Sequence, residues 1–237
     1  MRISLFMTPL ETRGALLAGA AAVVIDALRM TSTAVTAFEN GCAGMLAVRE
    51  VEEARALRAS DPSLLLGGER GGVLIAGFDL DNSPRSFTAQ RVGGRRVAMT
   101  TTNGTWAITG VAPARRVLLG AFLNAQAVAR ALLGEEAAVI QCAGTDDRLS
   151  LEDVLAGGAI LSRLLSLGAR AELDDAAQAA LALYRACGGD LDAALRGTHH
   201  YGVMLRGGQR ADIDFCLRED VFSSVPERGA DGFFHLS

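Results

Sequence analysis

The sequence contains no lysine, and all 23 of its basic residues are arginine. Without lysine the chain cannot carry the lysine of a phosphate-binding P-loop, a Schiff-base lysine or a Ser-Lys catalytic dyad. The formal net charge is −4, so there is no overall positive field that would hold a nucleic acid. These absences exclude several enzyme classes and argue against a nucleic-acid partner.

Cysteine is also scarce. The four cysteines lie far apart and form no C-x-x-C pair, so the sequence indicates neither a zinc site nor a disulfide framework. The apolar stretch 15–28 is too short to span a membrane and is interrupted by Asp26. No signal-peptide pattern stands at the N-terminus. We therefore expect a cytoplasmic protein without a membrane partner, and a homo-oligomer is left open.

Short apolar runs alternate with longer segments of helical periodicity, which predicts an α/β fold with a mainly parallel sheet and helices on both faces. We expect strands within 21–25, 45–48, 63–66, 95–100, 115–122 and 137–144, and helices over 31–40, 51–60, 125–133 and 150–168. From residue 171 the pattern is helical, and it closes in an irregular tail around Pro226. Residues 1–237 are interpreted as one domain, with a division into two subdomains left open.

Polar residues follow several of these strands. The strand ends deliver Asp26 with Arg29, the Gly-rich run 67–72 with Glu69 and Arg70, the run 101–105, and the Cys-Ala-Gly run 142–144. Ligands of open parallel sheets bind beyond the carboxyl ends of the strands, so these segments are expected to converge at one edge. A plain loop remains the alternative for the Gly-rich run.

The run "TTTNGT" predicts a strand-to-helix turn whose hydroxyls and free N–H groups hold an anion at a helix N-terminus. Its candidate ligand-binding residues are Thr101, Thr102, Asn103, Gly104 and Thr105. The alternative is structural, because threonine is a good strand residue and Asn-Gly a good turn.

The segment "CAGTDDRLSLED" has two interpretations. Ser150 with Asp153 resembles a helix capping box, which alone would account for Ser150, Glu152 and Asp153. Alternatively, the Asp146–Arg148 group forms a loop over the site. Cys142 is expected to be a buried apolar residue rather than a nucleophile. The three histidines lie near the C-terminus, where nothing places them near the site, and we expect the adjacent His199 and His200 to be surface residues rather than metal ligands.

Five motifs in order together resemble the 2-phosphosulfolactate phosphatases: "DALRMTSTAVTAFENG", "GGERGGVLIAGFDLDNSP", "TTTNGT", "CAGTDDRLSLED" and "DIDFC". The resemblance spans roughly Ile25 to Pro226. It implies a three-layer α/β/α fold with a mixed sheet. It also implies a magnesium-dependent acid phosphatase that converts (R)-2-phospho-3-sulfolactate to 3-sulfolactate and phosphate, a step of coenzyme M synthesis in methanogens.

The resemblance also suggests roles for individual residues. Asp26 and Glu69 are the expected Mg²⁺ ligands, because carboxylates without imidazole or thiolate suit this hard ion. Asp26, Glu69 and Asn103 are the catalytic candidates, and direct attack by water is favoured over a phosphoenzyme. The substrate, a small phosphorylated anion, is expected to bind at Arg29, Arg70, Asn82, Ser83, Thr101, Thr102, Asn103, Gly104, Thr105, Gly144 and Arg148.

The sequence departs from the family pattern at two positions where an arginine is usual. Trp106 follows "TTTNGT", and Thr145 follows Cys-Ala-Gly, with Arg148 near enough in sequence to compensate. Another phosphorylated hydroxy acid therefore remains open as the substrate. A non-catalytic protein that binds small anions or nucleotides is the alternative from a different functional class.

Overall fold

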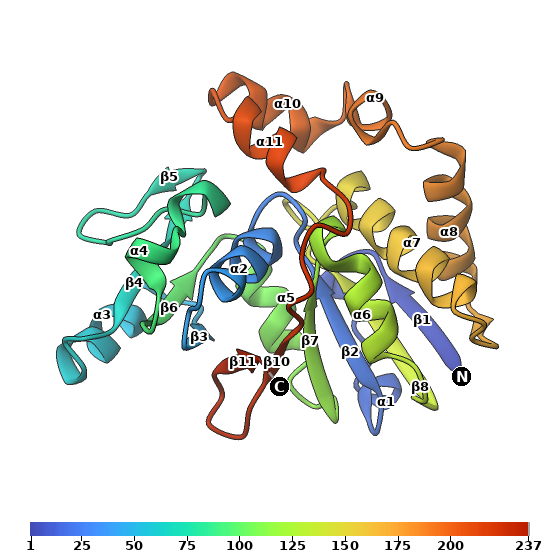
Figure 1. Cartoon of the computed structure of the whole chain (residues 1–237), viewed down its shortest axis with the longest axis horizontal. Helices are drawn as coiled ribbons and strands as arrows, with labels where there is room; N and C mark the ends of the chain where they lie inside the picture. The colour runs from blue at the N-terminus through green and yellow to red at the C-terminus, as the bar shows by residue number, and fades with distance from the viewer. Residues whose placement is uncertain (237) are drawn as a thin grey trace.

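One sheet of eleven strands runs through residues 1–236, the part of the chain that the computed structural model describes (Figure 1). The strand order across the sheet is β5-β4-β6-β3-β11-β10-β7-β2-β8-β1-β9. The strands are β1 (Arg2–Phe6), β2 (Ala21–Ile25), β3 (Gly44–Ala47), β4 (Leu65–Arg70), β5 (Val73–Leu74), β6 (Arg96–Thr100), β7 (Arg116–Gly120), β8 (Ala137–Cys142), β9 (Glu172–Leu173), β10 (Pro226–Arg228) and β11 (Phe234–Leu236).

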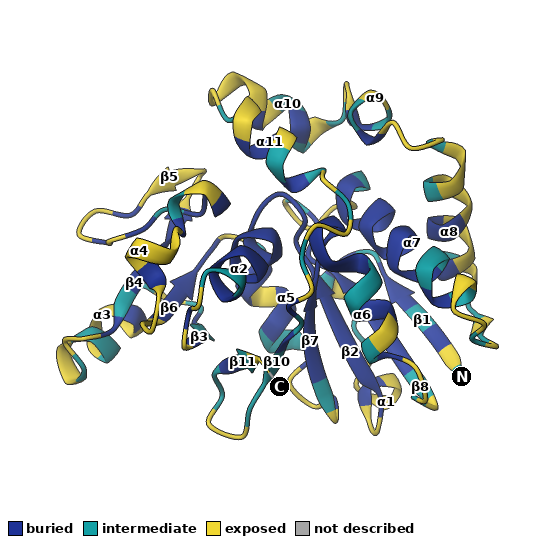
Figure 2. Ribbon diagram, viewed as in Figure 1, coloured by how far each residue is buried: buried dark blue, intermediate teal, exposed yellow. Residues whose placement is uncertain are grey.

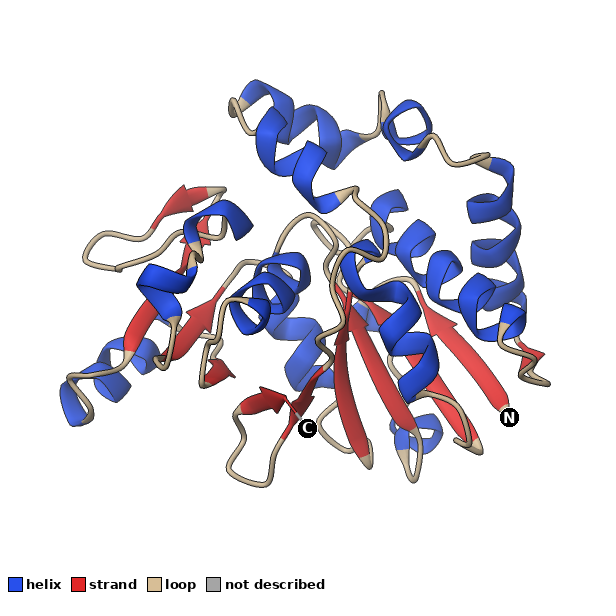
Figure 3. Ribbon diagram, viewed as in Figure 1, coloured by secondary structure: helices blue, strands red, loops and turns tan. Residues whose placement is uncertain are grey.

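Helices surround this sheet (Figure 3). Within the described residues the α-helices are α1 (Gly14–Leu17), α2 (Met30–Glu39), α3 (Val51–Ser60), α4 (Ala89–Val92), α5 (Gly104–Gly110), α6 (Ala125–Ala131), α7 (Leu151–Ser166), α8 (Asp175–Ala186), α9 (Leu191–Leu195), α10 (His199–Arg206) and α11 (Arg210–Cys216). Three short 3₁₀ helices join them, η1 (Pro9–Glu11), η2 (Pro84–Ser86) and η3 (Phe122–Asn124). None of the helices between residues 1 and 236 combines the length and apolar character needed to cross a bilayer.

The sheet consists of two parallel halves with an antiparallel hairpin between them, and β5 adds an antiparallel edge strand beside β4. Strands β7, β2, β8, β1 and β9 pair in parallel, as do β3, β6 and β4. The hairpin β10–β11 lies between the halves and pairs antiparallel with β7 and with β3. The prediction of an irregular tail around Pro226 is therefore wrong. Pro226 is the first residue of a strand, a position that tolerates proline.

The two faces of the sheet carry separate cores, which gives three layers. In β2, Ala21, Val23 and Ile25 pack into the core that contains residues of α6, α7 and α8. The residues between them, Ala22 and Val24, face the core that contains α2 and α5. All five residues of β2 are buried, because successive side chains of a strand point to opposite faces and both faces are covered (Figure 2). The expected three-layer α/β/α fold is confirmed.

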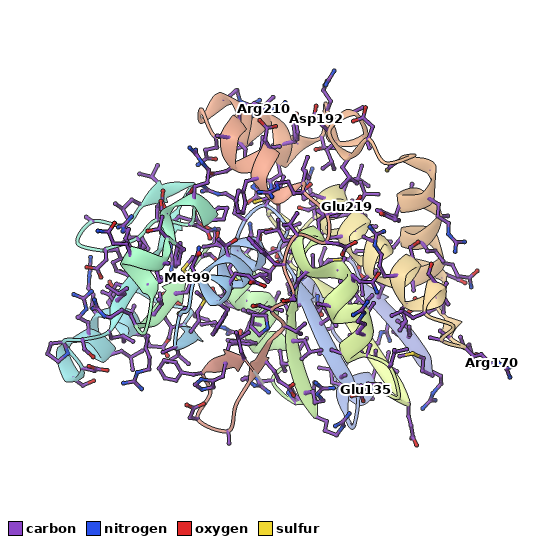
Figure 4. All side chains as sticks on the ribbon, in the orientation of Figure 1. Met99, Glu135, Arg170, Asp192, Arg210 and Glu219 are labelled. Atoms are coloured by element: carbon purple, nitrogen blue, oxygen red, sulfur yellow. The ribbon has the colours of Figure 1, made fainter. Side chains whose placement is uncertain are left out.

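Helices α9, α10 and α11 lie over the upper ends of the strands in Figure 1, and we call them the helical cap. Within the cap, Arg210 Nη2 of α11 lies 3.1 Å from Asp192 Oδ1 of α9; both residues are labelled in Figure 4. Beyond α11, Glu219 Oε1 lies 3.2 Å from Arg163 Nη2 of α7, which holds the following segment against the body of the protein. The C-terminal helical region therefore covers the edge where we expected the site.

Most elements expected from the sequence are present with small shifts at their ends. Helix α3 has the expected bounds, and Gly41, expected to end α2, has the positive φ of a left-handed residue. The Gly-rich run differs, because Gly67 to Arg70 belong to β4 rather than to a loop. Gly67 allows this close packing, since an added Cβ would lie 2.9 Å from Met99 Sδ on β6. Glu69 and Arg70 therefore point to opposite faces of a strand.

Candidate functional site

A polar cavity of about 360 Å³ lies at the strand ends beneath the helical cap, and we call it the main cavity. It receives residues from the ends of β2 and β4, from the segment before η2, from the β6–α5 turn, and from α10. Segments that are far apart in the sequence therefore converge here, as expected. The polar residues that line it include Asp26, Arg29, Glu69, Asn82, Thr102, Asn103, Thr145, Asp146, His199, His200 and Gln209.

Asp26 lies at the carboxyl end of β2, only 8% exposed. Its Oδ1 accepts a hydrogen bond from the Met30 N–H at 3.2 Å. The pKa of the Asp26 carboxyl is raised to about 6, mainly by burial; the Glu69 and Glu152 carboxylates act in the same direction, while His200 and the Met30 N–H oppose the shift. A Cβ added to Gly104 would lie only 2.5 Å from Asp26 Oδ2. The glycine that starts α5 therefore leaves room for this carboxylate.

Glu69 is held by three hydrogen bonds. Its Oε1 accepts from the Thr102 N–H at 2.8 Å and from the Thr102 hydroxyl at 3.1 Å. Its Oε2 accepts from the Gly72 N–H at 2.7 Å. The carboxylate therefore fixes the β6–α5 turn and the β4–β5 turn on either side of it. Oε1 uses both of its lone pairs in these bonds, whereas Oε2 retains one.

Some residues of the "TTTNGT" run have a structural role, and others line the main cavity. Thr101 and Thr105 are buried and bond to each other, with the Thr105 hydroxyl donating to Thr101 O at 2.9 Å. Thr102 and Asn103 line the main cavity, but the Thr102 N–H is already donated to Glu69. The structural alternative thus accounts for Thr101 and Thr105. The Thr102 hydroxyl also donates to Glu69, so Asn103 is the candidate anion contact of this run.

Arg29 enters the cavity paired with an acid from the cap. Its Nη1 lies 2.6 Å from Asp212 Oδ2, and both side chains are buried. Ser83, a predicted substrate-binding residue, does not line the main cavity; its hydroxyl donates to Asp212 Oδ1 at 2.7 Å. The late "DIDFC" motif supplies Asp212 and so orients the arginine. Asp212 was missed as a site residue because it falls in a helical pattern 183 positions from its partner.

Asn82 has a buried side-chain oxygen at the site that accepts no hydrogen bond from the described residues. It is 5% exposed and lines the main cavity, yet its Oδ1 has no hydrogen-bond partner among the described residues. Its backbone oxygen accepts from the Thr33 hydroxyl at 3.0 Å, which anchors the residue. A buried carbonyl oxygen without a partner is costly, so this atom points to a missing cation or donor.

Three further predicted binding residues, Arg70, Gly144 and Arg148, lie outside the main cavity. Arg70 turns away from the cavity and donates to Arg49 O and to the Thr100 hydroxyl, both at 2.9 Å. Gly144 allows the backbone of Arg148 to approach closely, because an added Cβ would collide with Arg148 O. Arg148 lines a neighbouring cavity of about 410 Å³, which we call the side cavity. The Asp146–Asp147 turn beneath it, with two positive φ values, does form a loop beside the site.

The expectation that the histidines lie away from the site is wrong for His199 and His200, which line both cavities, although His199 is exposed as expected. His200 Nδ1 lies 2.6 Å from Glu152 Oε1, and Glu152 is only 1% exposed. Although burial disfavours the charged ring, the hydrogen bond and the charge of Glu152 raise the pKa of His200 above its ordinary value. No sequence signal was available, because 48 residues separate the partners.

Asp153 is a second buried acid that the capping interpretation does not explain. Its Oδ1 accepts from the Ala27 N–H at 2.8 Å and its Oδ2 from the Gly144 N–H at 3.0 Å. Burial, together with the carboxylates of Asp26 and Glu152, raises the pKa of Asp153 well above its usual range. This side chain joins the turns that follow β2 and β8. Cys142, as expected, is a buried thiol, and burial raises its pKa.

A three-layer α/β fold with a polar cavity at the strand ends is typical of enzymes that act on small charged molecules. The family model described as 2-phosphosulpholactate phosphatase matches residues 6–230. The chain belongs to this family, whose members are phosphoric monoester hydrolases.

Three relatives illustrate the similarity, and each is named a probable 2-phosphosulfolactate phosphatase. The protein of Deinococcus radiodurans is 47% identical over 209 residues, which cover 86% of both chains. That of Symbiobacterium thermophilum is 42% identical over 213 residues, covering 89% of this chain and 91% of the relative. That of Caldicellulosiruptor saccharolyticus is 40% identical over 233 residues, covering 96% of both.

Proposed function

We propose that the chain is a Mg²⁺-dependent phosphatase that hydrolyses 2-phospho-3-sulfolactate, or a closely related phosphorylated hydroxy acid, to the hydroxy acid and phosphate. The family and the names of the relatives support the substrate class. The observation that carries the metal dependence is the set of buried oxygen atoms in the main cavity, from Asp26, Glu69 and Asn82.

This donor set fits Mg²⁺. All three groups offer oxygen, and neither thiolate nor imidazole is needed. Asn82 Oδ1 lacks a partner, and Asp26 forms no ion pair with any arginine or histidine among residues 1–236. Over the same residues, no group of three or more His, Cys, Asp and Glu side chains could hold a metal ion. Mg²⁺ suits such a sparse set, because it keeps several waters and takes further oxygens from a phosphate.

Charge supports the same conclusion. The substrate phosphate carries about −1.5 to −2 at neutral pH, whereas Asp26 and Glu69 place carboxylates in the cavity that should hold it. Two buried acids beside a phosphate repel it unless a cation lies between them. Bound Mg²⁺ would neutralise charge on the phosphoryl oxygens and help to orient the attacking water.

The chain's own residues then have distinct tasks. Arg29, fixed by Asp212, presents guanidinium N–H groups to phosphate oxygens. Asn103 contacts the anion from the turn before α5, and Thr102, whose N–H and hydroxyl both donate to Glu69, holds that carboxylate in place. Asp26 and Glu69, which both line the cavity, are the catalytic carboxylates that we propose. Water attacks the phosphorus directly in this scheme.

The cellular setting is proposed on the same basis. With 2-phospho-3-sulfolactate as substrate, the reaction is a step of coenzyme M synthesis. The four cysteines are free thiols in the structure, which suits the reducing cytoplasm.

A panel of phosphorylated hydroxy acids, assayed for released phosphate with Mg²⁺ and with excess EDTA, tests this proposal. We expect turnover with Mg²⁺, none with EDTA, and a preference for substrates that carry a second acidic group. Asp26→Asn should raise the Mg²⁺ concentration needed for half-maximal turnover or abolish turnover. Full activity in EDTA would end the metal assignment. Tight binding of the panel without hydrolysis would favour the alternative, a non-catalytic anion-binding protein.

A further inference from the structure

The main cavity and the side cavity adjoin, and they share a small set of lining residues. The residues common to both are Thr145, Asp146, His199 and His200. A phosphate ester has two parts, the phosphoryl group and the alcohol, joined by one bridging oxygen. If the phosphoryl group occupies the main cavity with Asp26 and Asn82, the bridging oxygen lies toward the shared residues and the alcohol enters the side cavity.

The side cavity has the polarity that a charged alcohol needs. Arg148 lines it and has no ion-pair partner within residues 1–236. Two buried polar atoms in its wall, Glu152 Oε2 and Thr198 Oγ1, lack hydrogen-bond partners among the same residues. Unfilled buried polar atoms indicate that a polar molecule belongs there. A hydroxy acid can bring its carboxylate to Arg148 and its hydroxyl to the Glu152 side.

Among the shared residues, His200 has a ring that is fixed in place. Its Nδ1 lies 2.6 Å from Glu152 Oε1, and the Glu152 carboxylate is almost wholly buried. A carboxylate only accepts, so Nδ1–H donates to it and the ring is held in one orientation. The other ring nitrogen, Nε2, has no hydrogen-bond partner among the described residues. A fixed imidazole with one free nitrogen at the boundary of two cavities suits proton transfer at the bond between them.

We propose that His200 is the general acid that protonates the leaving oxygen of the substrate, and that Glu152 is its positioning residue. The inference rests on the proposed phosphatase function and deepens it. Its basis is the position of His200 at the junction of the cavities and its bond to the buried Glu152.

The step balances without a further reactant. The oxygen of water forms a new bond to phosphorus, and the bond from phosphorus to the bridging oxygen breaks, leaving its electron pair on that oxygen. The proton on Nε2 moves to the same oxygen, so the alcohol departs neutral and the imidazolium becomes imidazole. The phosphate formed carries both hydrogens of the water, and it returns one of them to Nε2.

The surrounding charges keep the ring in its acid form. Glu152 on α7 and Asp26 at the end of β2 raise the pKa of His200, while burial and Arg29 before α2 oppose this change. Asp146, on the loop after β8, adds a further carboxylate to the cavity wall. Although burial is the largest single influence and lowers the pKa of His200, the net direction is upward, which favours the protonated ring that a general acid requires.

Leaving-group dependence is the test. Wild type, His200→Gln, Glu152→Gln and the distant control His235→Gln are assayed with Mg²⁺ on an alkyl ester, 2-phospholactate, and on p-nitrophenyl phosphate. The nitrophenolate leaves without protonation, so it needs no acid. We expect His200→Gln to lose about 10²- to 10⁴-fold in kcat on the alkyl ester and far less on the aryl ester. His235, bonded to Ala43 O and Asp231 in the hairpin region, should tolerate the change.

Glu152→Gln should give a smaller loss on the alkyl ester and move the alkaline limb of the pH–kcat profile to lower pH, because the carboxylate that raises the pKa of His200 is gone. A merely structural Glu152 would leave that limb in place. Equal losses on both esters in folded His200→Gln, or no loss on either, would overturn the general-acid assignment. A wild type that hydrolyses neither of these esters nor 2-phospho-3-sulfolactate would instead refute the proposed function, so the two failures are distinguishable.

Discussion

Gly104 offers the most direct test of the site, because one methyl group there acts on Asp26 and on little else in the cavity. A Cβ at this position would lie 2.5 Å from Asp26 Oδ2 and 2.8 Å from Met30 Cβ, whereas ordinary contact with a Cβ begins at 3.4 Å. In Gly104→Ala the carboxylate must therefore shift by about 0.9 Å, the difference between 3.4 and 2.5 Å. A displacement of about 1 Å at a reacting centre costs on the order of 10²-fold in rate, or about 2.7 kcal/mol.

The stability of this variant should change less than its activity. Alanine in a helix is favoured over glycine by about 1 kcal/mol, and overpacking costs about 1–3 kcal/mol, so the two effects partly cancel. We expect the free energy of unfolding to fall by at most about 2 kcal/mol, measured by urea denaturation. Steady-state kinetics should show the loss of about 10²-fold in kcat/KM.

The chain supplies a matched control in the same helix. Gly110 is the last residue of α5, and the nearest atom to an added Cβ is Thr12 Oγ1 at 3.9 Å. Gly110→Ala gains the same helical preference without a collision, so it should keep wild-type kinetics and equal or greater stability. Wild-type kcat/KM in Gly104→Ala would refute the placement of Asp26 at the reacting centre. An equal loss in both variants would show that α5 itself, and not the carboxylate, is responsible.

Changes at four further positions probe individual side chains. Arg70→Ala should keep near-wild-type kcat/KM, because its guanidinium faces away from the cavity; a large loss on the substrate panel would restore it as a substrate ligand. Asp212→Ala should destabilise the fold by roughly 3–5 kcal/mol by leaving Arg29 buried without its partner, as urea denaturation would show. Arg29→Lys should not rescue the activity that Arg29→Ala loses, since lysine lacks the planar fork. Burial raises the pKa of Asp26 from 3.8 to about 6, so the stability from its protonated form is present below pH 3.8 and is lost as the pH rises through 6. Metal-free Asp26→Asn should accordingly melt above wild type at pH 8 and like wild type near pH ~4; equal melting at both values would contradict the raised pKa.

Local patterns predicted most of the sheet and the helices that follow it. The run 21–25 is continuously apolar and ends at Asp26, and it forms a strand buried on both faces. The hairpin β10–β11 could not be predicted in this way. Its strands have three residues each, too few to show alternation, and they exist because β3 and β7 offer them pairing partners.

The site was predictable where it follows strand ends and not where it depends on tertiary contacts. The rule for parallel sheets brought Asp26, Glu69 and Asn103 to one cavity, although their chemical roles remain predictions. His200 reaches the cavity only because the helical cap folds over the strands, and nothing local in the sequence indicates this. Arg70 shows a different limit. Had "GGER" been read as strand, the alternation of side chains would have placed Arg70 opposite Glu69.

The central position of the hairpin has a consequence for how the chain folds. Glu227 of β10 pairs with Leu118 of β7, its carboxylate receives two hydrogen bonds from Arg116, and Phe234 of β11 pairs with Met45 of β3. The two parallel halves therefore cannot join through the sheet until residues 226–236 have left the ribosome. During synthesis, β3 and β7 present unpaired edges that are open to wrong partners. Assembly of the sheet therefore waits for residues 226–236, and contacts this distant in sequence predict slow closure.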